Sequence, residues 1–257
     1  MQAPLEFEKV VLAASCVGAR VSGLLVFTPF LGSSAIAPRM KAGLVVLLTA
    51  VLYPVCGPRQ MSLNAGGALR VMLAEALVGL LMGLTVQFVF EAAEFAGQFM
   101  GMQVGFGLVN LLDPNTQVDT PVLAVFSQTI VMLIFLQLGV HRWLLRALAS
   151  SFAYLPVGEA WATGAMTGEL LRLAGGIWLA GVQVAAPALM ATLLVDIVLG
   201  FLGKASPQLP VLFLGLSVKS MVGALVLGLS LRYWPAIFER YFNAAIHASE
   251  RLLQLAH

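Results

Sequence analysis

Long apolar runs, interrupted by single polar residues and by short breaks, occupy most of the chain. A helix that crosses a bilayer needs about 20 predominantly apolar residues. The stretches 121–140 and 173–195 meet that length without a charged residue. Five further runs, at 10–31, 42–54, 71–90, 95–112 and 205–231, are short or contain charged, amide or proline residues. The pattern predicts an all-α polytopic protein with about six membrane-spanning helices.

Clusters of proline, glycine and polar residues separate these runs. Residues 54–58 (PVCGP) and 156–158 (PVG) contain both proline and glycine, which end helices. Residues 113–120 form the most polar stretch in the middle of the chain and begin with Asp-Pro-Asn, a strong turn sequence. Residues 206–210 (SPQLP) predict a hairpin turn between two apolar helices.

Two segments are amphipathic rather than apolar throughout. In 142–155, Arg142, Arg146 and Ser150 recur every four residues, and the leucines lie elsewhere around the helix. In 235–255, one side of the helix carries Phe238, Phe242, Ala245, Ser249 and Leu253. Each pattern suits a helix at a membrane interface or a helix packed on a partner, and it does not separate the two.

Composition strengthens the membrane interpretation. The 257 residues are 60% hydrophobic and 10% charged, and the mean hydropathy is +0.95. Soluble domains are roughly half apolar and a quarter charged, so most helix faces here must meet lipid or apolar protein. The lysines and arginines do not segregate to alternate connections, which leaves open that helices pack against partner subunits. A net charge of +2 without a basic run argues against nucleic-acid binding.

Motifs for catalysis, metals and cofactors are missing, so the sequence predicts a protein that is not an enzyme and has no metal or cofactor. The three histidines have no second ligand at metal-binding spacing, and no nucleophile elbow or phosphate-binding loop occurs. Cys16 and Cys56 lie in apolar stretches and are interpreted as small buried hydrophobes rather than a disulfide pair.

Six charged residues lie within or beside apolar runs, where a charge costs about 2.5 to 3.5 kcal/mol on insertion scales. We expect them to pair with neighbouring helices or to line a wet interior, and they are candidate polar contacts between subunits. A proton relay through the carboxylates is the less favoured alternative. The six are Arg20, Glu75, Glu91, Glu94, Asp196 and Lys219.

Glycines recur every fourth residue in two places, at Gly79 and Gly83 and again at Gly97, Gly101 and Gly105. This spacing leaves one helix face without side chains, so another backbone can approach closely. An apolar, glycine-containing loop follows, and irregular backbone at membrane depth must be buried in protein or line a cavity. The loop residues are Gly105, Phe106, Gly107, Leu108, Val109, Asn110, Leu111, Leu112, Asp113 and Pro114.

The segment 75–126, which contains AGQFMGMQVGFGLVNLLDPNTQ, resembles the FliR/SctT family of type III export-gate proteins. The stretches 20–44, 141–156 and 186–219 support the resemblance in the same order. The family implies a FliP-like N-terminal part at 1–176 that includes a plug loop at 105–120. It also implies a FliQ-like helical hairpin followed by a C-terminal amphipathic helix at 177–257.

The resemblance implies a subunit of the flagellar export gate in the bacterial inner membrane, a multi-pass protein at the flagellar basal body. With FliP- and FliQ-like subunits it would form the entrance pore for secreted flagellar proteins, and its loop would plug the closed pore. Other implied partners are FlhB- and FlhA-like export proteins, unfolded export substrates and membrane lipid. An apolar constriction of this kind closes a pore by dewetting, without a catalytic group.

Three alternatives stay open at this point. The first is the SctT subunit of a virulence injectisome, although the plug segment and SFAYLP at 151–156 favour the flagellum. A small permease would use polar groups such as Glu75, Gln87 and Glu91 to hold its own substrate. A passive scaffold for other secretion proteins is the third. A permease should be stable alone, whereas a gate subunit should co-purify with its partners.

Overall fold

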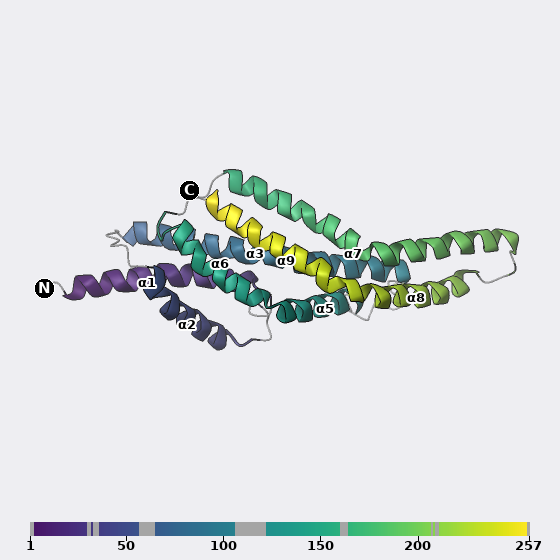
Figure 1. Ribbon diagram of the computed structural model, residues 1–257, viewed down its shortest axis with the longest axis horizontal. Helices are drawn as coiled ribbons and strands as arrows, with labels where there is room; N and C mark the ends of the chain where they lie inside the picture. Colours follow the sequence, from purple (N-terminus) through teal and green to yellow (C-terminus); the bar gives the residue numbers. More distant parts are fainter. Residues whose placement is uncertain are drawn as a thin grey trace. The chain divides into compact units, whose positions relative to one another are not determined.

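The computed structural model describes residues 3–29, 32, 36–56, 65–105, 122–159, 164–206, 208 and 211–255. Over these residues the chain is helical, without a β-strand, and the all-α prediction is confirmed. Figure 1 shows the elements along the chain. They are α1 (Ala3–Phe27), α2 (Pro38–Cys56), α3 (Ala65–Val104), α5 (Val122–Leu138), α6 (Val140–Tyr154), α7 (Gly164–Ala205), α8 (Val211–Ser230), the short 3-10 helix η1 (Leu231–Tyr233) and α9 (Trp234–Gln254).

Four helical stretches of the described residues are long and apolar enough to cross a membrane: Val10–Phe27, Gly66–Val104, Met166–Ala205 and Leu214–Gln254. The bent pair α5 and α6 raises the number to five if it counts as one span. The prediction of about six was therefore too high. It treated 71–90 and 95–112 as separate spans, whereas α3 runs unbroken for 40 residues through Glu91 and Glu94. Glutamate is a good helix former, so a charge does not end a helix. The protein is a multi-pass membrane protein.

The predicted breaks that fall on described residues agree with the helix ends. Helix α2 ends at Cys56, α6 is followed by an irregular turn at 155–159, and α7 and α8 are separated at 206–210. The apolar run 121–140 and the amphipathic segment 142–155 were predicted as separate helices, and the break between them lies at Gly139, where φ is 68°. The nearest atoms to a Cβ added at this position belong to the guanidinium of the exposed Arg142, which can move aside, so the backbone conformation rather than the available space favours glycine there.

The chain forms two compact units. Unit 1 comprises Met1–Phe88, Phe135–Ala174 and Tyr241–His257, and unit 2 comprises Val89–Ile134 and Gly175–Arg240. The predicted division into a FliP-like part at 1–176 and a FliQ-like part at 177–257 describes resemblance to two other proteins, not compact units. It stays a prediction.

Unit 1 is a bundle around one apolar core. The core takes buried side chains from α1, the first half of α3, α6 and the end of α9, including Val17, Val21, Leu24, Val78, Met82, Leu148, Phe242 and Leu252. Both amphipathic predictions are confirmed. Arg142, Arg146 and Ser150 are exposed on α6, and the predicted apolar side of α9 is buried throughout. The chain itself therefore covers the apolar faces of both helices.

Unit 2 combines the second half of α3 with α5, α7 and α8. Small residues dominate its core, and the buried set includes Phe90, Ala93, Ala96, Met100, Ala124, Val131, Val184, Ala185 and Ala188. Other faces of α7 and α8 present large apolar side chains outward. Phe201 and Met221 are 72% and 74% exposed. These faces must meet lipid or apolar protein, because water-exposed patches of this size are rare on soluble proteins.

Candidate functional site

The glycines of α3 lie where a neighbouring helix backbone approaches closely. A Cβ on Gly79 would be 2.8 Å from the carbonyl carbon of Arg20 and 2.9 Å from the amide nitrogen of Leu24, both in α1. Gly23 on α1 makes the reciprocal approach to α3, and the sequence pattern did not single it out. Contact at backbone distance places the side chains that flank these glycines directly between the two helices.

Gly83 also faces α1, where an added Cβ would lie 2.6 Å from the carbonyl oxygen of Leu24. In unit 2, Gly97 approaches α5, and a Cβ there would lie 2.5 Å from the Cα of Ala124. Gly101 is buried in the same helix. Real Cβ atoms essentially never lie this close to backbone atoms. Gly79, Gly83 and Gly97 can therefore be replaced by a larger residue only if a helix moves.

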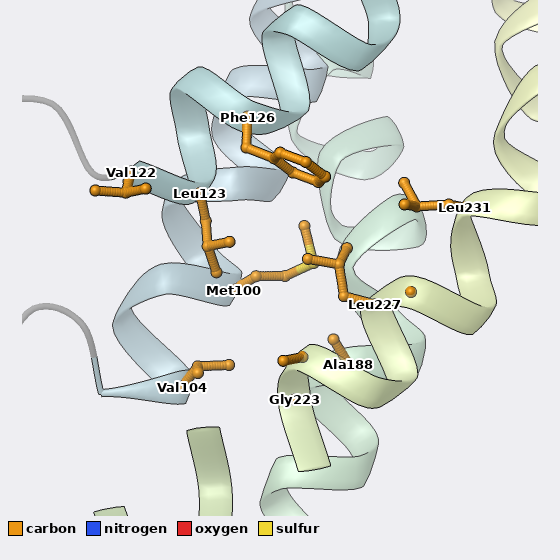
Figure 2. A pocket seen from close by; sticks show the side chains of 11 residues that line it. Met100, Val104, Val122, Leu123, Phe126, Ala188, Gly223, Leu227 and Leu231 are labelled. Atoms are coloured by element: carbon orange, nitrogen blue, oxygen red, sulfur yellow. The ribbon is translucent and has the colours of Figure 1, made fainter. Parts of the chain in front are cut away.

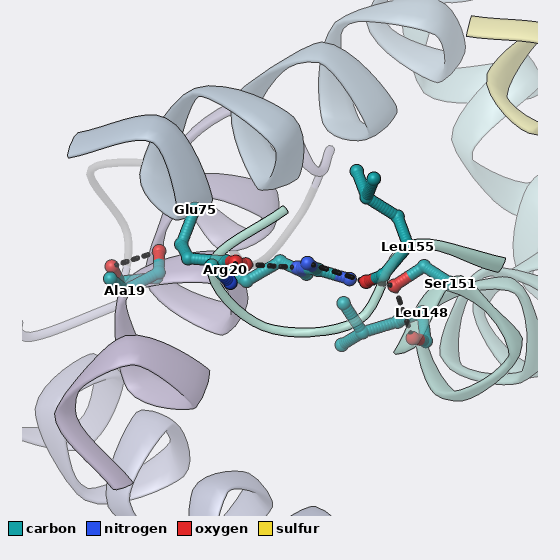
Figure 3. Close-up of polar contacts among 8 residues, drawn as sticks. Ala19, Arg20, Glu75, Leu148, Ser151 and Leu155 are labelled. Atoms are coloured by element: carbon teal, nitrogen blue, oxygen red, sulfur yellow. Dashed lines mark hydrogen bonds and ion pairs between the residues drawn. The ribbon is translucent and has the colours of Figure 1, made fainter. Parts of the chain in front are cut away.

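A fully buried ion pair lies beside the Gly79 contact (Figure 3). The Arg20 Nε atom is 2.5 Å from Oε2 of Glu75, and neither side chain is exposed to solvent. The same guanidinium donates at 3.0 Å to Oγ of Ser151 and at 3.0 Å to the carbonyl oxygen of Leu155. It also stacks over the Phe152 ring, 4.2 Å from the ring centroid. All hydrogen-bonding nitrogens of the guanidinium are thus engaged.

The Glu75 carboxylate has a second partner. Its Oε1 atom accepts a 2.9 Å hydrogen bond from the backbone nitrogen of Gly158, in the turn after α6. The ion pair therefore joins α1, α3, α6 and this turn within unit 1. A buried pair is tolerated when further hydrogen bonds satisfy its remaining donors and acceptors, as they do here. Arg20 and Glu75 have their charge partners within the chain, so no partner subunit is needed to explain them, and Glu75 is not available to hold a permeant substrate.

Three more of the predicted charges also have partners within the chain. In unit 2, Lys219 Nζ is 2.7 Å from Oδ1 of Asp196, and Gln103 donates to the other oxygen of Asp196 at 3.2 Å. Glu94 accepts hydrogen bonds from two glutamine side chains, Gln98 at 3.2 Å and Gln128 at 3.5 Å. Contacts of these residues and of Glu91 with other subunits stay a prediction.

An apolar cavity of about 260 Å³ lies within unit 2, at the end of α3 (Figure 2). Met100 and Val104 of α3 face it, together with Phe126 of α5 and Leu227 of α8. Val122, at the start of α5, also belongs to its lining. Gly223 of α8 lies against the Val104 side chain, so α8 contributes no side chain of its own at this contact with α3. Ser220 fixes the same helix end by donating to the carbonyl oxygen of Val104 at 3.2 Å.

The predicted plug loop begins at this helix end. Gly105 ends α3 with φ 97°, and a Cβ there would collide with the Leu216 side chain. The loop residues Phe106, Gly107, Leu108, Val109, Asn110, Leu111, Leu112, Asp113 and Pro114, like the rest of 106–121, lie outside the described residues. The described flanks of this segment are close together, because Val104 before it and Val122 after it line the same cavity.

Residues 11–245 match the family described as "Bacterial export proteins, family 1". The protein belongs to this family. The predicted resemblance is thereby confirmed, and membership makes the chain a component of a bacterial export apparatus.

Relatives in the bacterial export family extend the match over nearly the whole length. The flagellar biosynthetic protein FliR of Pectobacterium carotovorum subsp. carotovorum is 29% identical over 224 residues, which cover 87% of this chain and 86% of the relative. FliR of Escherichia coli (strain K12) is 28% identical over 228 residues, 87% of either chain. FliR of Bacillus subtilis (strain 168) is 26% identical over 240 residues, 92% of either chain.

Proposed function

We propose that this protein is the FliR-like subunit of a flagellar type III protein export gate, a multi-pass component of the bacterial inner membrane at the flagellar basal body. The observation that carries the proposal is the match to export proteins along residues 11–245. Relatives named flagellar biosynthetic protein FliR align over 86 to 92% of their own length. These names favour the flagellum over a virulence injectisome.

In this proposal FliP- and FliQ-like subunits complete the pore, and FlhA- and FlhB-like proteins deliver unfolded substrates to it. The exposed apolar faces of α7 and α8 support such an assembly. Trp178, Phe201 and Met221 are each more than 60% exposed on these helices. In a membrane complex such side chains pack on partner helices or lipid, since apolar surface gains nothing from facing an aqueous channel.

We further propose that the segment 105–120 closes the pore. Two features of the described flanks support this. The left-handed Gly105 turns the chain sharply away from the axis of α3. Both flanks reach one apolar cavity, so the two ends of the segment are held close together. An apolar segment tethered at both ends can block a pore by excluding water and can be displaced by a substrate without any bond being broken.

Removal of residues 106–115 tests the plug. Cells that carry the deletion should leak small ions or dyes through the gate, while the FliP- and FliQ-like subunits still co-purify with the chain in mild detergent. A second variant replaces 106–115 with glycine and serine at the same length; it should leak too, because bulk rather than length blocks the pore. Gly168→Ala is the control, since a Cβ there meets nothing within 4 Å and the residue does not line the cavity beside the plug segment.

The outcomes separate the two parts of the proposal. Unchanged permeability in an assembled complex would refute the plug and leave the role in the gate intact. A chain that is stable as a monomer and recruits no FliP- or FliQ-like partner would refute the gate itself and favour a small permease.

A further inference from the structure

Unit 1 contains a second apolar cavity, which the proposed gate function does not use. Its volume is about 340 Å³, at the lower end of the range for ligand pockets, roughly 300 to 1,000 Å³. Leucines from four helices form most of its wall: Leu24 and Leu25 of α1, Leu44 and Leu48 of α2, Leu136 of α5, and Leu144 and Leu145 of α6. An unfilled apolar space forfeits dispersion contacts along its whole lining, so an apolar occupant would be stabilised there.

The stretches of chain that line this cavity carry positive charge only. The stretches 24–48 and 135–146, which supply its lining, contain Arg39, Lys41, Arg142 and Arg146 and neither aspartate nor glutamate. The carboxylate of Glu75, elsewhere in unit 1, is already paired with Arg20. An occupant with an anionic group would therefore meet cations without a competing carboxylate on the lining stretches.

Two of these cations belong to the helix turns that line the cavity. Lys41 is three and seven residues before Leu44 and Leu48, so it shares their face of α2. Its ammonium donates at 2.9 Å to the carbonyl oxygen of Gly32, beyond the end of α1. On α6, His141 lines the cavity and the exposed Arg142 follows it. Apolar lining residues and basic residues thus occur in neighbouring positions on the same two helices.

We propose that this cavity binds an anionic phospholipid, with an acyl chain among the leucines and the phosphate head group against Lys41 and Arg142. Basic pockets between membrane helices are a recurring site for anionic head groups. A soluble phosphate ester would gain nothing from the leucine walls, and a zwitterionic lipid would gain less from the cations. The bound lipid fills the space between α1, α2 and α6 and so fixes α2, which packs mainly against α1.

The test uses the full chain in the complex with which it purifies in mild detergent. The complex is stripped of lipid and titrated with phosphatidylglycerol or phosphatidylcholine, and bound lipid is counted by native mass spectrometry. Phosphatidylglycerol should bind more tightly. The double variant Lys41→Gln, Arg142→Gln should weaken its binding about 30-fold, since each cation near a lipid surface contributes roughly fivefold.

Two further variants keep the test decisive. Leu48→Trp fills the cavity and should reduce the binding of both lipids while leaving the cations in place. Arg232→Gln removes an exposed arginine of η1, outside the lining stretches, and should change nothing.

Equal binding of the two lipids, or full retention of phosphatidylglycerol by the double variant, would overturn the proposal. So would competition by inorganic phosphate alone, which would indicate a soluble anion. A cross-link from Leu44→Cys to a partner protein, in place of lipid, would assign the cavity to a protein segment and equally refute it.

Discussion

Glu75→Gln removes one charge from the buried pair and alters almost nothing else, because glutamine has the size and shape of glutamate. The new amide side chain keeps one oxygen, which can accept a hydrogen bond from the Gly158 nitrogen or from Arg20, but not from both. The Arg20 guanidinium keeps Ser151 and the Leu155 carbonyl as acceptors. It is then a fully buried cation without a counter-charge.

The expected cost follows from that geometry. Breaking a buried ion pair by removing one partner costs about 3–5 kcal/mol. The 2.5 Å contact and the complete burial of both side chains place this pair in that class rather than among exposed pairs. Against a total stability of about 5–15 kcal/mol, the variant should lose a large part of its free energy of unfolding. Arg20→Met in the same background removes the unpaired charge and should recover about 2 kcal/mol, with the rest lost to unsatisfied acceptors.

Unfolding in mixed micelles with increasing dodecyl sulfate, followed by tryptophan fluorescence, measures these differences. Trp143 lies on α6, close in sequence to the network residue Ser151. Arg172→Gln is the control, since this exposed arginine pairs with Glu169 three residues away on the same helix; it should leave the midpoint unchanged. Two results would contradict this reasoning: Glu75→Gln unfolding at the same dodecyl sulfate concentration as the wild type, or the double variant Glu75→Gln, Arg20→Met being less stable than Glu75→Gln alone. Either would mean that the buried ion pair is not a main source of stability for the contact between these helices.

Two glycine substitutions test the close helix contacts. Gly79→Ala places a Cβ 2.8 Å from the Arg20 carbonyl carbon and should destabilise the protein by about 1–3 kcal/mol through overpacking, as read from the same micelle titration. A midpoint equal to that of Gly66→Ala, where an added Cβ meets nothing within 4 Å, would contradict the contact. Gly105→Ala forces a side chain into φ 97° and should cost at least about 1–2 kcal/mol. Faster proteolysis within 106–121 would report the loosened end of α3, and unaltered cleavage would argue against this role for Gly105.

The sequence by itself determined the fold class, most of the helix boundaries and the family. Apolar runs and proline–glycine breaks are local properties, and each leaves a pattern within a few residues. The amphipathic faces of α6 and α9 were predictable for the same reason, because the spacing of Arg142, Arg146 and Ser150 alone fixes a polar side. The glycine spacing at Gly79 and Gly83 likewise marked a helix face suited to close approach.

Only the tertiary structure decided which groups meet. Arg20 and Glu75 are 55 residues apart. Six charged residues lie within or beside apolar runs, and the sequence around Arg20 does not indicate which of the others is its partner. The sequence also did not reveal that α3 continues past Glu91 and Glu94, because a charged residue in an apolar run resembles the end of a membrane span. Only the structure shows that Gln128 of α5 donates a hydrogen bond to the Glu94 carboxylate. The two cavities arise where side chains from three or more helices fail to fill a space. Such gaps depend on packing between distant segments, which no local pattern records.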